Sequence, residues 1–333
     1  MTPSLEARQL TIEVDAGRRS FTPVEDLDVA VAPGRALGIV GESGSGKSLT
    51  LRALMGLLPP RVTVRSGEIR VDGEVIPRST SRRPRATPGV AMVFQEPLGA
   101  LNPLLRVKGL LDDVLRAGGR SGRKGTEERA LSLLREVGIS DPAAVMSAYP
   151  HQISGGQRQR VMIAMAMASE PRVLLCDEPT TALDVTIQQR ILRLLRRIRE
   201  EHEMSLIYVT HDLAVVNEVC DDVAIIYAGQ IVESGKAEEV FASPAHPYTR
   251  MLIDSVPDVA ERLDDLVGIP GVAPNPWQFP TGCRFHPRCF MAEPSCSEGP
   301  AFTRRQISTD RATACTYAEQ LLDLSGGSDG SAA

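Results

Sequence analysis

Aromatic residues are scarce in this 333-residue chain, where Phe, Tyr and Trp together make up 4%. The core must therefore consist mainly of aliphatic side chains. Hydrophobic residues make up 42% of the chain, enough to form a buried core, and the length suffices for one large domain and a smaller one. The chain also lacks an excess of positive charge, since its net charge at pH 7 is −5. Nucleic-acid-binding domains usually present a strongly basic surface, so this balance disfavours a nucleic-acid partner.

Long apolar segments are missing as well. No apolar run approaches the roughly 18 residues that a membrane-spanning helix needs. Residues 1–10 contain charged side chains and no long apolar stretch, so a secretory signal is not indicated. We therefore expect a cytosolic protein that acts at a membrane only through a partner.

A glycine-rich stretch organises the rest of the chain: residues 41–48 read Gly-Glu-Ser-Gly-Ser-Gly-Lys-Ser. An apolar run that predicts a buried strand precedes it, and a helical pattern that ends at Gly56 follows it. Glycines let backbone N–H groups converge on phosphate oxygens at a helix N-terminus. Lys47 would reach the β- and γ-phosphates, and Ser48 would be a ligand of Mg²⁺. A Gly/Ser-rich surface turn is the alternative, but a nucleoside triphosphate site explains the lysine and the hydroxyl.

Two adjacent carboxylates, Asp177 and Glu178, follow a buried strand predicted at residues 173–176. Open α/β sheets bind ligands at the carboxyl ends of their strands. Paired carboxylates at such an edge suit Mg²⁺ binding and activation of a water molecule. An acidic helix N-terminus is the alternative, and it fits less well directly after a buried strand.

The remaining patterns predict an α/β fold with a largely parallel sheet, because strands alternate with helices. Asp72-Gly73 lies between two short strand patterns and predicts a hairpin, hence a small antiparallel sheet beside the nucleotide. Residues 98–149 have helical periodicity and no convincing strand, so we predict an all-helical insertion. Ser154 is expected to cap the helix that follows.

Together these motifs resemble the ATP-binding subunits of ATP-binding cassette (ABC) transporters. The motifs that carry the resemblance occur in the family's order: the Walker A loop at 41–48, the Q-loop at Gln95, the signature at Ser154-Gly155-Gly156-Gln157, Walker B at Asp177-Glu178, the D-loop at Ala182-Leu183-Asp184 and the switch histidine at His211.

The resemblance implies a RecA-like P-loop NTPase core with an antiparallel β subdomain and an inserted helical subdomain, plus a small C-terminal extension. On this basis we expect the nucleotide-binding domain at 1–235, with its helical subdomain at about 98–168, and the extension at 236–324. The Gly/Ser-rich tail at 325–333 is expected to be disordered.

The resemblance also implies that two cassettes bind ATP between them, head to tail. Glu178 would polarise the attacking water, His211 would contact the γ-phosphate, and Gln95 would sense nucleotide and metal. The implied Mg²⁺ ligands are Ser48, Gln95 and Asp177. Ser154 and Gly156 would touch the γ-phosphate of the ATP that the other subunit binds. The implied ATP-binding residues are Gly41, Glu42, Ser43, Gly44, Ser45, Gly46, Lys47, Ser48, Leu49, Ser154, Gly155, Gly156, Gln157 and Asp184.

The C-terminal residues resemble a smaller group within this family. Residues 244–249, 269–271 and 282–289 are similar to the extension of dipeptide, oligopeptide and nickel importer ATPases. The implied partners are a second ABC ATPase subunit, a copy or a paralogue, an integral-membrane permease and, indirectly, an extracytoplasmic substrate-binding protein. The protein would then lie on the cytoplasmic face of the cell membrane. The alternatives are a nickel or other small-solute importer, or a non-transport ABC ATPase that acts on nucleic acid or ribosomes.

Four of the six cysteines, Cys283, Cys289, Cys296 and Cys315, gather in this extension. Thiolates suit Zn²⁺ or an iron–sulfur cluster, although the spacing is not that of a Cys-x-x-Cys zinc ribbon. Some similar importer subunits carry a [4Fe-4S] cluster, which we take as the hypothesis here. Four free thiols in a loop-rich extension are the alternative.

One departure from the family concerns the base of ATP. Near residue 14 the family often has an aromatic residue that stacks on adenine, whereas this chain has Val14. The one aromatic residue before the phosphate loop is Phe21, which is either the stacking ring after a loop shift or a packed loop residue.

Overall fold

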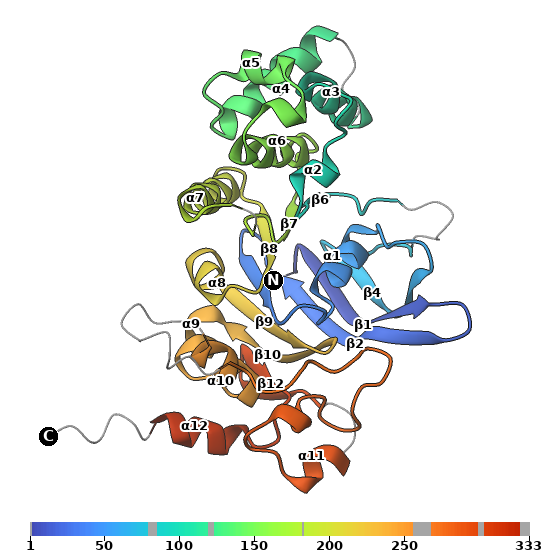
Figure 1. The fold of residues 1–333 in the computed structure, drawn as a ribbon, viewed down its shortest axis with the longest axis vertical. Helices are drawn as coiled ribbons and strands as arrows, with labels where there is room; N and C mark the ends of the chain where they lie inside the picture. The colour runs from blue at the N-terminus through green and yellow to red at the C-terminus, as the bar shows by residue number, and fades with distance from the viewer. Residues whose placement is uncertain are drawn as a thin grey trace, which may run out of the picture.

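The computed structural model describes residues 2–78, 85–118, 123–181, 183–255, 268–298 and 303–326. Its centre is a mixed sheet with the strand order β11-β12-β10-β9-β3-β8-β7-β6 (Figure 1). The strands of this central sheet are β3 (Ala36–Val40), β6 (Val90–Val93), β7 (Val173–Asp177), β8 (Ser205–Thr210), β9 (Asp222–Tyr227), β10 (Gln230–Lys236), β11 (Arg305–Ser308) and β12 (Arg311–Thr313).

Five neighbouring strands of the central sheet, β9, β3, β8, β7 and β6, are parallel. Strands β3, β6, β7 and β8 are buried along their whole length, as expected when helices or a second sheet cover both faces. Strand β10 returns antiparallel to β9 through Gly229. A Cβ atom at Gly229 would lie 2.0 Å from the carbonyl oxygen of Pro23, and its φ is +83°, so the turn requires glycine. The predicted, largely parallel sheet is confirmed.

A second, antiparallel sheet has the order β2-β1-β4-β5. Its strands are β1 (Leu5–Asp15), β2 (Ser20–Val31), β4 (Val62–Val71) and β5 (Glu74–Val75). The predicted hairpin is confirmed, since β4 and β5 pair antiparallel around Asp72 and Gly73, whose φ angles are 50° and 84°. Helix α1 (Lys47–Met55) shares one apolar cluster with this sheet and with one face of the central sheet.

The predicted helical insertion is confirmed for the described residues between β6 and β7, which form helices and no strand. Its elements are α2 (Pro97–Ala100), α3 (Val107–Ala117), α4 (Arg123–Glu136), α5 (Pro142–Ser147), a 3-10 turn (Pro150–Gln152) and α6 (Gly155–Met167). Figure 1 shows these helices at one end of the molecule, with the antiparallel sheet and the extension away from them. Ala91 and Val93 of β6 share a cluster with α6, whereas Val90 and Met92 share one with α1, so the two helices lie on opposite faces of β6.

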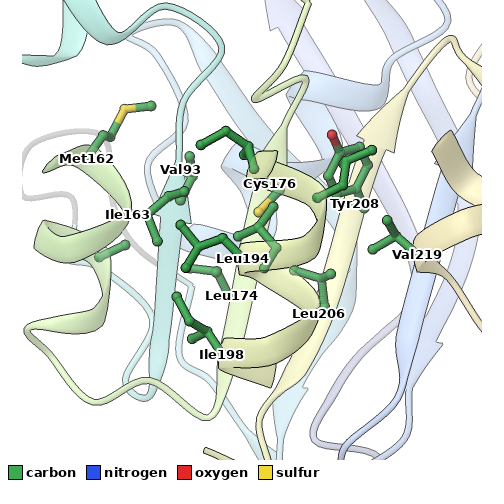
Figure 2. Packing of buried hydrophobic residues seen from close by; sticks show 14 of the residues in the cluster. Val93, Met162, Ile163, Leu174, Cys176, Leu194, Ile198, Leu206, Tyr208 and Val219 are labelled. Carbon is green, nitrogen blue, oxygen red and sulfur yellow. The ribbon is translucent and has the colours of Figure 1, made fainter. Parts of the chain in front are cut away.

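Helices α7 (Val185–Glu201) and α8 (Leu213–Val219) cover the face of the central sheet that is opposite to α1. Figure 2 shows Leu194 and Ile198 of α7 in one cluster with Leu174 of β7 and Leu206 of β8. All are fully or almost fully buried. Each such side chain contributes about 1.5–3 kcal/mol through removal of apolar surface from water, so this cluster holds the helix on the sheet.

The C-terminal extension is built onto the central sheet, because β12 pairs with β10. The buried side chain of Arg311 in β12 forms an ion pair of 2.8 Å with the buried Glu233 of β10. The helical elements of this region are α9 (Ala237–Ala242), α10 (Pro247–Asp254), a 3-10 turn (His286–Arg288), α11 (Pro294–Glu298) and α12 (Ala318–Gly326). Helix α12 includes the first two residues of the expected tail, and residues 327–333 lie outside the described residues.

A buried histidine should make the stability of this fold depend on pH. The Nδ1 atom of His246 accepts a hydrogen bond of 3.1 Å from the Tyr248 N–H and so caps α10. Burial lowers the pKa of His246 from 6.5 to about 3. Between these values the unfolded chain binds a proton that the folded chain does not, so stability falls by about 1.4 kcal/mol for each pH unit of acidification.

His246→Asn keeps a capping acceptor but removes this titration. We expect the wild-type protein to lose free energy of unfolding, relative to the variant, as the pH falls below 6.5. Urea unfolding of both proteins at successively lower pH measures the difference. A difference that does not change with pH would contradict this assignment.

Candidate functional site

Four of the predicted site residues follow neighbouring parallel strands at one edge of the central sheet. The register pairs Val40 of β3 with Thr210 of β8, Val209 of β8 with Asp177 of β7, and Cys176 of β7 with Val93 of β6. The carboxyl ends of these strands therefore lie side by side. The residues that continue from them are Gly41, His211, Glu178 and Gln95.

The phosphate loop has the backbone of an anion cradle. Gly44 and Gly46 have φ angles of +79° and +102°, which favour glycine. Gly46 precedes α1 without a side-chain cap, and the first N–H groups of a helix have no partner inside the helix. A Cβ atom at Gly41 would lie 2.1 Å from the Ile226 carbonyl oxygen, so β9 approaches the loop too closely for any other residue. The loop can accept phosphate through backbone N–H groups and the helix dipole.

Lys47 is directed back over this loop. Its Nζ atom donates hydrogen bonds to the carbonyl oxygens of Gly41 and Glu42, at 2.7 and 2.9 Å. The side chain is buried, and burial lowers its pKa, while the carboxylates of Glu178, Asp177 and Glu42 oppose that shift. Because both hydrogen bonds are made to neutral oxygens, the ammonium group remains available to pair with a phosphate.

Ser48 and Asp177, predicted as ligands of Mg²⁺, lie together. The Ser48 hydroxyl donates a hydrogen bond of 2.8 Å to Oδ1 of Asp177. Burial raises the pKa of Asp177, and the bond from Ser48 opposes the shift. A buried carboxylate and a hydroxyl beside a phosphate cradle are the hard oxygen ligands that Mg²⁺ prefers, so these residues fit the ion. The third predicted ligand, Gln95, instead donates from Nε2 to Oε2 of Glu178 at 3.3 Å.

Glu178 is the centre of a polar group at the sheet edge. Its Oε2 atom accepts hydrogen bonds from Gln95 and from the Thr181 hydroxyl at 3.0 Å, and it lies 3.4 Å from Nδ1 of His211. Its φ angle is +43°, a left-handed conformation that a residue other than glycine keeps only when its surroundings hold it. Thr181 was not among the predicted site residues. The sequence feature that could have identified Thr181 is its position three residues after Glu178, directly following Pro179-Thr180.

The signature residues lie elsewhere. Ser154 caps α6 as predicted, because its hydroxyl accepts from the Gln157 N–H at 3.2 Å and its own N–H donates to Oε1 of Gln157 at 2.9 Å. Helix α6 belongs to the helical insertion, and Figure 1 shows it well separated from α1, which follows the phosphate loop directly. Asp184 caps α7 by accepting from the Ile187 N–H at 2.9 Å, and Ala182 of the D-loop lies outside the described residues. One chain therefore holds the signature and the phosphate loop apart.

The extension reaches the phosphate loop, which the sequence patterns did not reveal. A cleft of about 490 Å³ lies between residues 42–45 of the loop and residues 272–276 of the extension. The ring of Phe21 lies 4.2 Å from the ring of Trp277, which is half exposed. Phe21 is thus packed against an aromatic residue of the extension. The contacts of Arg288 and Tyr248 with Glu42 were also missed, because they join residues that lie more than 200 positions apart.

The four cysteines of the extension line one cavity of about 140 Å³, which we call the cysteine cavity. Burial raises the pKa of Cys289 to about 11 and that of Cys315 to about 12. Within the described part of the chain, no three His, Cys, Asp or Glu side chains are arranged closely enough to hold a metal ion. The sequence placed the four thiols in one region, and the fold directs them to one cavity without assembling a metal site.

Comparison with known proteins identifies the family. A family model described as "ABC transporter" matches residues 24–181, and one described as "Oligopeptide/dipeptide transporter, C-terminal region" matches residues 232–296. The dipeptide transport ATP-binding protein DppD of Escherichia coli is 39% identical over 316 residues, which cover 94% of this chain and 96% of that protein. The chain belongs to the ABC transporter family. DppD of Haemophilus influenzae is 43% identical over 296 residues, which cover 88% of this ABC protein and 90% of the relative.

Solved structures of ABC cassettes share its fold. The dimeric cassette MJ0796, bound to ADP and Pi after hydrolysis, superposes with a TM-score of 0.60 at 26% identity and covers 70% of this chain and 98% of that one. Clostridium perfringens cbiO1, part of the ABC transporter complex cbiONQ, superposes with a TM-score of 0.59 at 26% identity. The match covers 73% of this chain and 92% of that one. The predicted RecA-like P-loop core is confirmed, and the chain is an ATPase of this family. No helix among the described residues is both long enough and apolar enough to span a membrane.

Lys47→Ala tests the phosphate cradle. Loss of a charge-assisted bond of about 1.5–3 kcal/mol should raise the Kd for MgATP on the order of 10- to 100-fold. Calorimetric titration of the full chain measures this value. Lys236→Ala is the matched control, because that exposed lysine forms an ion pair with Glu239, outside the phosphate loop, and its loss should leave the Kd unchanged. Wild-type affinity in Lys47→Ala would refute the cradle.

Proposed function

We propose that this chain is the ATP-hydrolysing subunit of a transporter that imports dipeptides or oligopeptides. The observation that carries the proposal is similarity to dipeptide transport ATP-binding proteins over nearly the whole chain, 94% of it for the Escherichia coli protein. The match includes the extension, where a second family model covers residues 232–296. The extension thus ties the chain to peptide transport more closely than the cassette alone does.

The two halves of each ATP site are contributed by two cassettes. The separation of the signature from the phosphate loop supports this arrangement, as does the dimeric form of the related cassette MJ0796. Ser154 and Gly156 of one subunit would then meet the γ-phosphate held by the loop of the other. ATP favours the closed dimer and hydrolysis releases it, so the chemical step drives a change of shape.

Within each site, we assign a role to each residue from its position at the carboxyl edge of the central sheet. Lys47 and the loop N–H groups bind the phosphates of the substrate ATP. Mg²⁺, held by Ser48 and Asp177 with Gln95 nearby, would neutralise charge on those phosphates. Glu178 would accept a proton from the attacking water, and His211 would contact the γ-phosphate, a role supported by the 3.4 Å between its Nδ1 atom and Glu178. Gln95 connects this edge to the helical insertion through α2.

The partners follow from this function. A second cassette, a copy or a paralogue, completes both ATP sites. An integral-membrane permease docks on the helical insertion and holds the subunit at the cytoplasmic face of the membrane. An extracytoplasmic binding protein delivers the substrate to the permease and does not contact this chain.

Uptake by cells tests the function. We expect cells that lack this gene to lose uptake of labelled dipeptides or oligopeptides, and the wild-type gene to restore it. Glu178→Gln should not restore it, because loss of a general base slows hydrolysis by on the order of 10² to 10⁴ while MgATP still binds. Purified wild-type and Glu178→Gln proteins provide the matched measurement of turnover and of Kd.

Three outcomes would overturn the proposal. Loss of nickel uptake with normal peptide uptake would assign the chain to a metal importer. Co-purification with ribosomes or DNA, and not with membrane subunits, would indicate a non-transport ATPase. Unchanged turnover in Glu178→Gln would remove Glu178 from its assigned role.

We further propose that the cysteine cavity holds a [4Fe-4S] cluster. The support is that all four cysteines line one cavity in a region with few buried apolar side chains, where a bound cofactor would add stability. Bringing the sulfur atoms into ligand geometry requires a rearrangement of the extension, since the described side chains do not form a metal site. The four cysteines would hold the cluster as thiolates, so each thiol would lose its proton when the cluster binds.

Iron and acid-labile sulfide in anaerobically purified protein measure this directly. We expect both in the wild-type chain, and their loss in Cys289→Ser. Cys220→Ala is the control, since that thiol is buried in the cassette core and should not change the iron content. A wild-type chain with neither iron nor sulfide would contradict the cluster, and zinc in their place would assign the cavity to that metal.

A further inference from the structure

The phosphate loop is held from outside the cassette at one residue, Glu42. Its carboxylate makes two parallel hydrogen bonds with Arg288 of the extension, from Nη1 to Oε2 at 2.7 Å and from Nη2 to Oε1 at 2.9 Å. Its backbone N–H donates to the hydroxyl oxygen of Tyr248 in α10 at 2.9 Å. The extension therefore holds both the side chain and the backbone of the second residue of the loop.

Arg288 joins three segments at this point. Besides Glu42, it donates from Nη1 to the hydroxyl oxygen of Tyr227 at the end of β9, at 3.3 Å. Its Nε atom donates to the carbonyl oxygen of Pro270 at 2.7 Å. Only 7% of its side chain is exposed, against 26% for that of Glu42. A bidentate pair so shielded from water is stronger and more directional than an exposed ion pair.

The aromatic residues around this junction keep it rigid. Tyr227, Tyr248 and Phe285 are buried and lie within ring-contact distance of one another, with centroids 4.6–5.3 Å apart. Phe285 lies three residues before Arg288 in the same extension segment. The ring cluster thus fixes the positions of both groups that hold Glu42.

The glycines of the loop make its binding conformation costly to hold. Gly41, Gly44 and Gly46 give it conformational freedom that costs entropy when phosphate binds. A loop already held in its binding conformation pays less of that cost. Glu42 lies between Gly41 and Gly44, so its contacts restrain the glycine-rich part of the loop.

We propose that Arg288 and Tyr248 are positioning residues for the ATPase reaction: the extension holds the phosphate loop through Glu42 in the conformation that binds MgATP. The extension is then a working part of the nucleotide site. This inference rests on the proposed ATP-binding role of the loop and adds to it the control of nucleotide affinity by residues of the extension.

The test uses Arg288→Gln and Tyr248→Phe in the full chain. Each should raise the Kd for MgATP by roughly 10-fold, because each removes one of the two residues through which the extension holds Glu42. Arg288→Lys should not restore wild-type affinity, because an ammonium group cannot make the two parallel bonds. Tyr248→Phe removes only a hydroxyl and keeps the ring packing, so it remains informative if Arg288→Gln folds poorly. Arg250→Gln, in the exposed pair with Asp254 of the same extension, is the control and should bind normally.

Two further readouts separate positioning from general stability. KM for ATP should rise while kcat at saturation stays near the wild-type value, since Arg288 contacts Glu42 and neither Glu178 nor His211. In a Glu42→Gln background, Arg288→Gln should add little further loss, because the two residues act as a unit.

The outcomes are distinct from those of the proposed function. Wild-type affinity in both Arg288→Gln and Tyr248→Phe, or full additivity of Arg288→Gln with Glu42→Gln, would overturn the inference and leave the ATPase assignment intact. Failure of the wild-type chain to bind MgATP would instead refute the proposed function.

Discussion

The register of four parallel strands is the constraint on which the site depends. Strands β3, β8, β7 and β6 are neighbours, and their paired residues end at nearly the same level. Parallel strands present all their carboxyl ends at one edge, so residues that lie far apart in the sequence continue from that edge together. The phosphate loop, Glu178, His211 and Gln95 meet for this reason. A shift of one residue in one pair would displace one of these groups along the strand axis by about 3.3 Å relative to the others.

Around this edge the loop is held from several sides. Helix α1 continues directly from it and is packed between the two sheets, which share one apolar cluster. The carbonyl oxygen of Ile226 in β9 lies close to Gly41. Gly229, in the turn between β9 and β10, lies close to the carbonyl oxygen of Pro23. The extension adds the contacts with Glu42. A flexible, glycine-rich loop thus obtains a defined shape from neighbours that belong to three different parts of the chain.

The same architecture keeps the signature residues of one chain apart from its own phosphate loop. The signature is the N-terminus of α6, and α6 is packed within the helical insertion, whereas the loop is packed against the antiparallel sheet. The central sheet lies between the two clusters that hold them. Under the proposed function, such a cassette works as one of a pair and couples the chemistry at the sheet edge to the relative position of two subunits. Gln95, which lies between β6 and the helical insertion while bonded to Glu178, connects these two ends of the molecule.

The sequence by itself determined the elements that local chemistry dictates. Glycine spacing with Lys47 and Ser48 predicted the phosphate loop, apolar runs predicted the buried strands, and Ser154 predicted a helix cap, because each depends on residues that lie close together along the chain. Only the tertiary structure decided that Gln95 contacts Glu178, that Thr181 joins them, and that Phe21 is packed on Trp277. It also decided that Arg288 and Tyr248 hold Glu42, and that four thiols share a cavity without forming a metal site. Those contacts join segments far apart in the sequence, and no local pattern encodes them, since they arise only when the strands pair and the extension packs against the cassette.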